Sequence, residues 1–77
     1  MNLIKLLATS ISICIDTNNN ILKILLHDYA KTKLSKKQLY LLYCYISNVD
    51  KDTQLYIIMH KWISNNPDTI IKQFLKL

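Results

Sequence analysis

The stretch LYLLYCYI, residues Leu39 to Ile46, is a run of eight apolar or aromatic residues in a chain of 77. As a β-strand it would be apolar on both faces, which only a sheet covered on both sides accommodates. The chain offers no second segment of comparable quality to pair with it. Ser35 and Gln38 upstream form a capping-box pattern, and Asn48 downstream is a typical helix-ending residue. The run therefore predicts a helix that is apolar nearly all round, and such a helix is either central or shared with a partner.

Apolar residues recur at the helical period along the rest of the chain. In residues 20–32 the core-facing stripe is Leu22, Leu25, Leu26 and Tyr29, and Ile21 and Ile24 widen it. Because the connections between predicted helices are short, sequential helices are expected to pack as antiparallel neighbours. The fold prediction is an all-α, compact bundle of four to five short antiparallel helices in a single domain, residues 1–77. The predicted helices are 3–15, 20–32, 36–48, 52–64 and 67–76.

The chain turns without glycine, since its sequence contains none. Asparagine is the next residue most tolerant of the left-handed conformation, so Asn18 to Asn20, Asn48 and Asn65 are expected to replace glycine at helix ends. Helix starts are expected at Asp16 or Thr17 for the second helix and at Asp50 or Asp52 for the fourth.

The composition predicts apolar residues on the outside of the molecule. Hydrophobic residues make up 51% of the chain, yet a chain this short buries only about 60% of the surface that its unfolded form exposes. Large exposed apolar patches usually mark contact sites, so a partner or a second copy is expected. The abundance of Ile, Asn, Lys and Tyr is typical of an AT-rich genome, such as that of a virus, a parasite or an organelle.

Tyrosines are the residues that most favour a contact surface. A tyrosine combines an apolar ring with a hydroxyl that needs a partner, and it is enriched at protein interfaces. The alternative interpretation is that these rings fill a small core, with their hydroxyls at its wet edge. Base stacking would need cations between the tyrosines, and the run 39–46 has none. The predicted partner-binding residues are Tyr40, Leu41, Tyr43, Tyr45, Tyr56 and Trp62.

A basic stretch, KTKLSKK, places Lys31, Lys33, Lys36 and Lys37 within seven residues, in a chain of formal net charge +5. Four clustered ammonium groups favour the phosphates of nucleic acid or of lipid, with strongly salt-dependent binding. The alternative is a solvated loop whose first two lysines complement a helix end. Lys36 and Lys37 stand at a helix start, where they oppose the helix dipole. The stretch therefore predicts a nucleic-acid-binding site as an alternative function.

Metal and catalytic chemistry are not expected. The candidate ligands Cys14, His27, Cys44 and His60 lack the close pairing of zinc sites. Both cysteines lie within apolar stripes, where a free thiol usually acts as a small hydrophobe. The absence of glycine also excludes the usual phosphate-binding loop. The sequence predicts no enzyme, no catalytic residue, no metal site and no cofactor.

The N-terminal segment raises a membrane alternative. Its run LLATSISICI is ten residues long, whereas spanning a bilayer needs about 20 apolar residues, and it lacks a secretory cleavage signal. Residues 3–15 could lie on a membrane surface, but Thr9, Ser10 and Ser12 on their polar side carry no charge. We expect this helix to pack on the others or on a second copy.

These observations predict a small non-enzymatic protein–protein interaction module that acts as a homo-oligomer, with a homodimer expected, or as a complex subunit. Its expected partner is a protein or a second copy of the chain, without a small-molecule substrate. A lysine-rich nucleic-acid-binding protein and a membrane-surface peptide are the two alternatives. The expected location is cytoplasmic, within the host cell if the source is viral.

Overall fold

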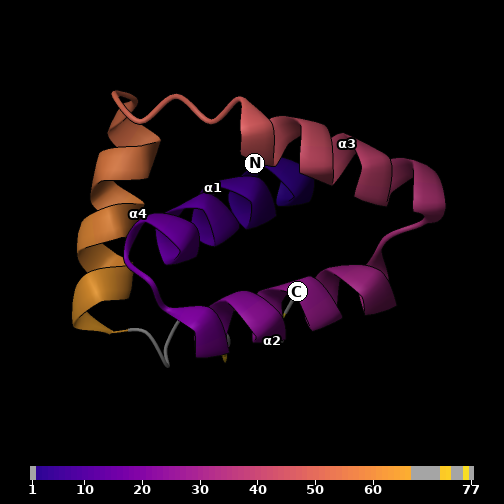
Figure 1. Ribbon diagram of the computed structural model, residues 1–77, viewed down its shortest axis with the longest axis horizontal. Helices are drawn as coiled ribbons and strands as arrows, with labels where there is room; N and C mark the ends of the chain where they lie inside the picture. The colour runs from indigo at the N-terminus through magenta and orange to yellow at the C-terminus, as the bar shows by residue number, and fades with distance from the viewer. Residues whose placement is uncertain (1, 67–71, 74–75, 77) are drawn as a thin grey trace.

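Four α-helices contain most of the residues that the structure describes. The structure is a computed structural model, and it describes residues 2–66, 72, 73 and 76 (Figure 1). No strand occurs within these residues, and the all-α prediction is confirmed. The predicted fifth helix, 67–76, lies almost entirely outside the described residues. The helices are α1 (Leu3–Asp16), α2 (Asn20–Lys33), α3 (Lys36–Ser47) and α4 (Gln54–Asn65).

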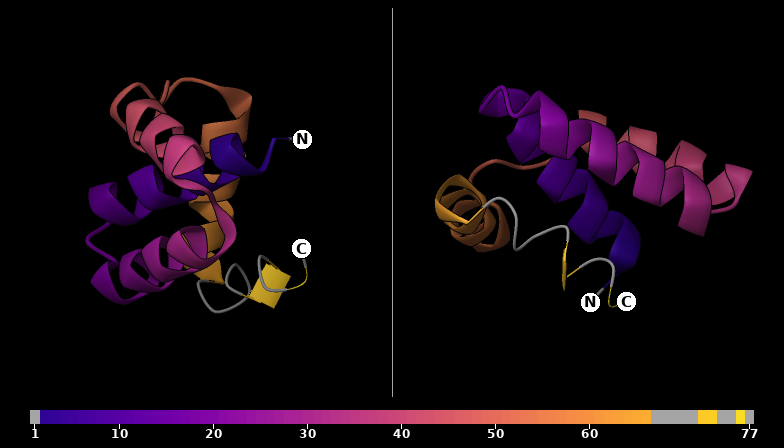
Figure 2. Two further views of the ribbon diagram at one scale, coloured as in Figure 1. Left: turned by 90° about the vertical axis from the view of Figure 1, so that its right-hand side faces the viewer. Right: turned by 90° about the horizontal axis from the view of Figure 1, so that it is seen from below.

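α1 is the central helix of the bundle. It packs against α2, α3 and α4, whereas the three outer helices contact one another only sparsely. In Figure 1, α2 runs antiparallel to α1, α3 runs in the same general direction as α1 on its other side, and α4 crosses at one end. Figure 2 shows this arrangement from the side and from below. Among the described helices, the predicted antiparallel packing of sequential neighbours therefore holds for α1 and α2 only. α3 and α4 each pack against α1 and only sparsely against the helix that precedes them in the chain.

Eight consecutive residues of α1, Leu7 to Cys14, are buried, so this part of the helix is covered on all sides. The predicted polar side of this helix is buried as well, including Thr9 and Ser10. The Thr9 hydroxyl donates to the carbonyl of Lys5 at 2.8 Å, and the Ser10 hydroxyl donates to the carbonyl of Leu6 at 2.8 Å. Because these hydroxyls bond within their own helix, they need no water and can face the packed interior.

The apolar run of residues 39–46 forms most of α3, as predicted, but α3 is an outer helix. Leu42 is the one residue of α3 that is buried, with none of its surface exposed. Leu39 and Ile46 are partly buried on the same side of the helix and pack against the core. Of the two alternatives predicted for this run, the central position is therefore excluded, because α1 fills that place, and contact with a partner stays a prediction.

Side chains close the helix ends at positions that the sequence predicts in part. The capping box of α3 is confirmed: the Ser35 hydroxyl accepts from the amide of Gln38 at 3.2 Å, and the Gln38 side chain accepts from the amide of Ser35 at 3.0 Å. α2 begins after Asn19 rather than at Asp16 or Thr17, and α4 begins after Thr53 rather than at Asp50 or Asp52. The residue that caps the C-terminus of α3 is Asn48, as expected, and the one that caps α4 is Asn66, one residue beyond the predicted Asn65.

Asn18 takes the role that glycine usually has after a helix. Its φ is 56°, in the left-handed region, and it alone among the described residues has a positive φ. The amide of Asn19 donates to the carbonyl of Cys14 at 2.9 Å, and the amide of Asn18 donates to the carbonyl of Ile15 at 3.3 Å. This pair of bonds is a Schellman motif, which satisfies carbonyls at the end of α1 and turns the chain into α2.

Candidate protein interaction surface

The outward side of α3 carries an apolar ridge. Tyr40 and Cys44, which are four residues apart and therefore neighbours on the helix surface, lie on the side away from the buried Leu42, and Leu41, three residues before Cys44, borders them. All three are exposed, and 69% of the Tyr40 surface is accessible to solvent. A ridge of this kind has no covering element in the described part of the chain.

Two further tyrosines extend the ridge to either side. The ring centroid of Tyr43 lies 6.1 Å from that of His27 on α2, so Tyr43 leans toward that helix. Tyr45 lies on the opposite flank and lines a pocket between α1, the end of α3 and the α3–α4 connection. Both tyrosines are exposed. We call the five residues together the α3 surface: Tyr40, Leu41, Tyr43, Cys44 and Tyr45.

The pocket beside Tyr45 has a volume of about 270 Å³. Typical small-molecule sites are larger, at about 300–1,000 Å³. Its wall is mainly apolar, with Val49 and Leu55, and its rim carries the opposite charges of Lys5 and Asp50. A recess of this size next to an exposed tyrosine suits one side chain of a bound protein.

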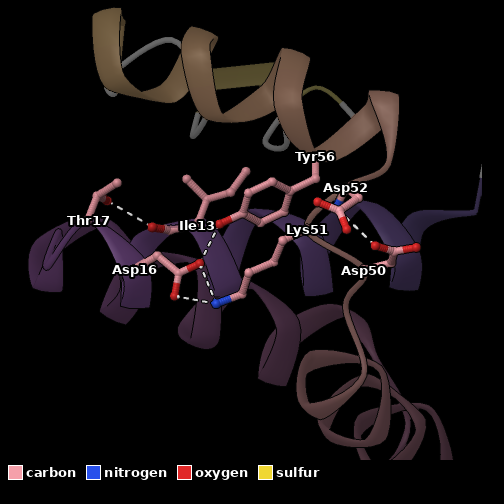
Figure 3. Close-up of polar contacts among 7 residues, drawn as sticks. All are labelled: Ile13, Asp16, Thr17, Asp50, Lys51, Asp52 and Tyr56. Atoms are coloured by element: carbon pink, nitrogen blue, oxygen red, sulfur yellow. Dashed lines mark hydrogen bonds and ion pairs between the residues drawn. The ribbon is translucent and has the colours of Figure 1, made fainter.

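The structure separates Tyr56 and Trp62 from the other predicted partner-binding residues. Only 7% of the Tyr56 surface is exposed, because this residue faces α1 and donates its hydroxyl hydrogen bond to the Asp16 carboxylate (Figure 3). The prediction that Tyr56 binds a partner is therefore wrong, because its ring belongs to the core. Trp62 is exposed on α4, together with Ile57 and Ile58, and α4 packs only sparsely against α3.

A third exposed apolar group lies on α2. Ile21, Ile24 and Leu25 are all exposed, and 77% of the Ile21 surface is accessible. The sequence assigned all three residues, Ile21, Ile24 and Leu25, to a wide core-facing stripe, which is wrong. α2 buries a narrow side that includes Leu22 and Leu26, since α1 is the only one of the described helices that packs extensively against it. The excess width of the apolar stripe was the signal that some of it would stay outside.

The four clustered lysines lie at one corner of the molecule. Lys31 and Lys33 end α2, Lys36 and Lys37 begin α3, and all four are exposed. This corner is where the ribbon turns between the two helices, at the end of the bundle away from α4 (Figure 1). Their grouping adds positive charge beside one end of the α3 surface.

A polar cluster joins three segments on another side of the bundle. Asp16, at the end of α1, accepts hydrogen bonds from Tyr56 on α4 and from Lys51, whose ammonium also lies 3.0 Å from the second carboxylate oxygen. The Asp52 amide donates to the Asp50 carboxylate at 2.9 Å (Figure 3). These contacts connect elements of the fold, and their geometry suits a structural role.

The remaining reactive groups are dispersed. Burial raises the pKa of the Cys14 thiol to about 11, with Lys23 opposing the shift, so the thiolate is scarce at neutral pH. Among the described residues, no three His, Cys, Asp or Glu side chains gather closely enough to hold a metal ion. Within the same residues, every helix is too short or too polar to span a bilayer.

Comparison with protein-family models, curated proteins and solved structures found no match to this chain.

Proposed function

We propose that this chain is a small, non-enzymatic protein–protein interaction module that binds its partner through the α3 surface. The observation that carries the proposal is the exposure of three tyrosines and a leucine on a helix that buries a single residue, Leu42. The partner is a second copy or another subunit of a complex. In either case the α3 surface supplies the contact.

The physical support comes from the way the bundle is built. A single central helix covers one narrow face of each outer helix, which leaves the other apolar residues in solvent. Contiguous exposed apolar patches on small proteins usually mark binding sites. Tyrosine adds contact area at low conformational cost, because its ring is rigid, and its hydroxyl tolerates water before binding.

Site-specific photo-crosslinking in the native source tests this function. A benzophenone-bearing amino acid at position 40 should give discrete covalent adducts, because Tyr40 is the most exposed tyrosine of the α3 surface. The matched control carries the same group at Ser64, which is exposed on α4. Adducts of equal yield from both positions, or none from position 40, would overturn the proposal.

A second candidate function is nucleic-acid binding at the lysine corner, supported by the exposure of Lys31, Lys33, Lys36 and Lys37 on either side of one turn. Each phosphate contact contributes about 0.9 to the slope of log affinity against log salt concentration. Replacing all four lysines by glutamine should abolish retention on DNA or RNA. Retention that survives this change, or that is missing in the wild type, removes the candidate.

We do not extend the proposal to the membrane alternative, because residues Leu7 to Cys14 of α1 are buried against the other described helices. From composition alone we further infer an AT-rich genome as the source, a virus being one candidate, and a cytoplasmic location. Fractionation of the native source tests the location, and recovery of the chain in a membrane fraction would contradict it.

A further inference from the structure

The two ends of α3 carry opposite charges. Lys36 and Lys37 occupy its first turn, and Asp50 and Asp52 follow shortly after its last residue, Ser47. All four charged residues are exposed. α3 spans about 18 Å at 1.5 Å per residue, so the α3 surface lies between a positive end and a negative end.

Lys36 and Lys37 lie at the end of their own helix where a positive charge is unfavourable. The N-terminus of a helix carries partial positive charge and favours carboxylates, yet the first turn of α3 holds two ammonium groups and no acid. Asp50 and Asp52 have a local reason for their position, since they precede the N-terminus of α4. No such reason exists within the described chain for Lys36 and Lys37.

We propose that the α3 surface binds the α3 surface of a second copy, antiparallel, about a two-fold axis near Cys44. This inference rests on the proposed function and names its partner. In this arrangement Lys36 and Lys37 of each copy lie beside Asp50 and Asp52 of the other. They also lie beside the negative C-terminal end of the other α3. Symmetry makes each contact occur twice.

The register follows from the same charges. The midpoint between Lys37 and Asp50 falls between Tyr43 and Cys44, close to the middle of the α3 surface. The small Cys44 side chain on the ridge lets two helices approach, while Tyr40 and Leu41 pack toward the C-terminal half of the other helix. A parallel pairing would instead place the two lysine ends together, where like charges repel.

Because each copy contributes one helix of 12 residues, we expect the interface to fall in the small class of less than about 1,200 Å². We therefore expect a dimer that exchanges with monomer in the micromolar range. The net charge of +5 on each copy opposes association, and salt screens that long-range repulsion over a Debye length of about 8 Å at physiological ionic strength.

Cross-linking at Cys44 tests the position of the axis. A short bis-maleimide should join two copies rapidly through Cys44, to a species of twice the 9.1 kDa chain. Cys14 is buried and should not react in the folded protein. The control is a Cys44→Ser, Ser64→Cys double variant, which carries its single exposed thiol on α4 and should cross-link at least about tenfold more slowly. Equal rates for the two proteins would overturn the proposed axis.

Charge exchange tests the antiparallel register, measured by sedimentation equilibrium. Lys36→Asp with Lys37→Asp should weaken self-association at least about tenfold, since like charges then meet. The same change should leave the helix content unchanged or higher, because aspartate suits a helix start. Asp50→Asn with Asp52→Lys should also weaken self-association, while retaining an acceptor at position 50. A mixture of the two variants should form a heterodimer about as readily as the wild type associates.

The outcomes separate this inference from the proposed function. A wild-type chain that stays monomeric, or a mixture of charge variants that fails to associate, overturns the antiparallel dimer. Photo-crosslinking from position 40 to a different protein would also overturn it, yet would support the proposed function. Absence of any adduct from position 40 would count against the proposed function itself.

Discussion

The hydroxyl of Tyr56 on α4 donates a hydrogen bond to the carboxylate of Asp16, the last residue of α1, forty positions earlier in the chain. Asp16 lies at a helix C-terminus, where a negative charge is unfavourable by itself. The tyrosine hydroxyl and the Lys51 ammonium compensate that charge and hold α4 and the α3–α4 connection against the central helix.

Tyr56→Phe should lower the free energy of unfolding by about 1 kcal/mol, the loss expected for a partly exposed hydrogen bond to a charged acceptor. In a domain of this size that loss lowers the midpoint of thermal unfolding by about 4–8 °C. Circular dichroism on heating measures it. Tyr40→Phe is the matched control, because the Tyr40 ring is exposed, and it should leave the midpoint unchanged. Equal effects of the two changes would contradict the role given to the Asp16 contact.

The stability difference between the wild type and Tyr56→Phe should shrink at both extremes of pH. The hydrogen bonds from Tyr56 and then Lys51 hold the pKa of Asp16 below its ordinary 3.8. Stabilisation is therefore complete above pH 3.8 and is lost as the pH falls through the folded-state pKa. Burial, followed by the bond to Asp16, raises the pKa of Tyr56 from 10.0 to about 12. The stabilisation that comes from the protonated Tyr56 hydroxyl is therefore complete below pH 10 and is lost as the pH rises toward 12.

Urea unfolding of both proteins across the two pH ranges measures this dependence. Taking the difference between the proteins removes the titration of the other tyrosines and of the lysines, which both chains share. A difference that stays constant through both ranges would show that the hydroxyl and the carboxylate are not coupled.

Leu41 and Leu42 are neighbours in α3, but truncation of Leu42 should affect stability and truncation of Leu41 should affect binding. Leu42 is fully buried, so Leu42→Ala should destabilise the fold by about 2–5 kcal/mol. Leu41 is exposed, so Leu41→Ala should change the free energy of unfolding by less than about 0.5 kcal/mol while weakening binding through the α3 surface. Urea unfolding of dilute protein separates the two effects. A large loss of stability for Leu41→Ala would mean that α3 packs by a different face.

Asn18 should tolerate glycine but not alanine. The left-handed conformation costs a residue with a Cβ about 1–2 kcal/mol, and asparagine reduces that cost. Asn18→Ala should therefore destabilise the protein by about 1 kcal/mol, and Asn18→Gly should be neutral or slightly stabilising. Asn20→Ala is the control, because Asn20 has helical geometry in α2. Chemical denaturation ranks the three variants, and an Asn18→Ala protein as stable as the wild type would contradict the assignment.

Much of the secondary structure could be predicted because its signals are local. The Ser35–Gln38 capping box lies within one helical turn of the run that it introduces, so the helical reading of residues 39–46 needed no knowledge of the rest of the chain. The residues that cap the starts of α2 and α4 were predicted wrongly, since each connection offers several residues that can cap a helix. Asp16 in particular is held at the end of α1 by Tyr56, a contact that no local pattern contains.

The candidate site was predictable in part. Tyr40, Leu41, Tyr43 and Tyr45 are exposed on α3, but Tyr56 is buried although it has the same side-chain chemistry. Residue type cannot distinguish these cases, because a tyrosine becomes a core residue when a distant acceptor is brought within reach of its hydroxyl.

Local patterns in the amino-acid sequence are enough to predict helices, the position of most of them, and more apolar surface than so short a chain can bury. The choice of α1, and not of α3, as the central helix depends on how the helices pack together. The physical reason is that the hydroxyls of Thr9 and Ser10 bond to carbonyls of their own helix. A helix whose polar groups are satisfied internally can be buried on every side, and α3, with its charged ends, is left on the surface.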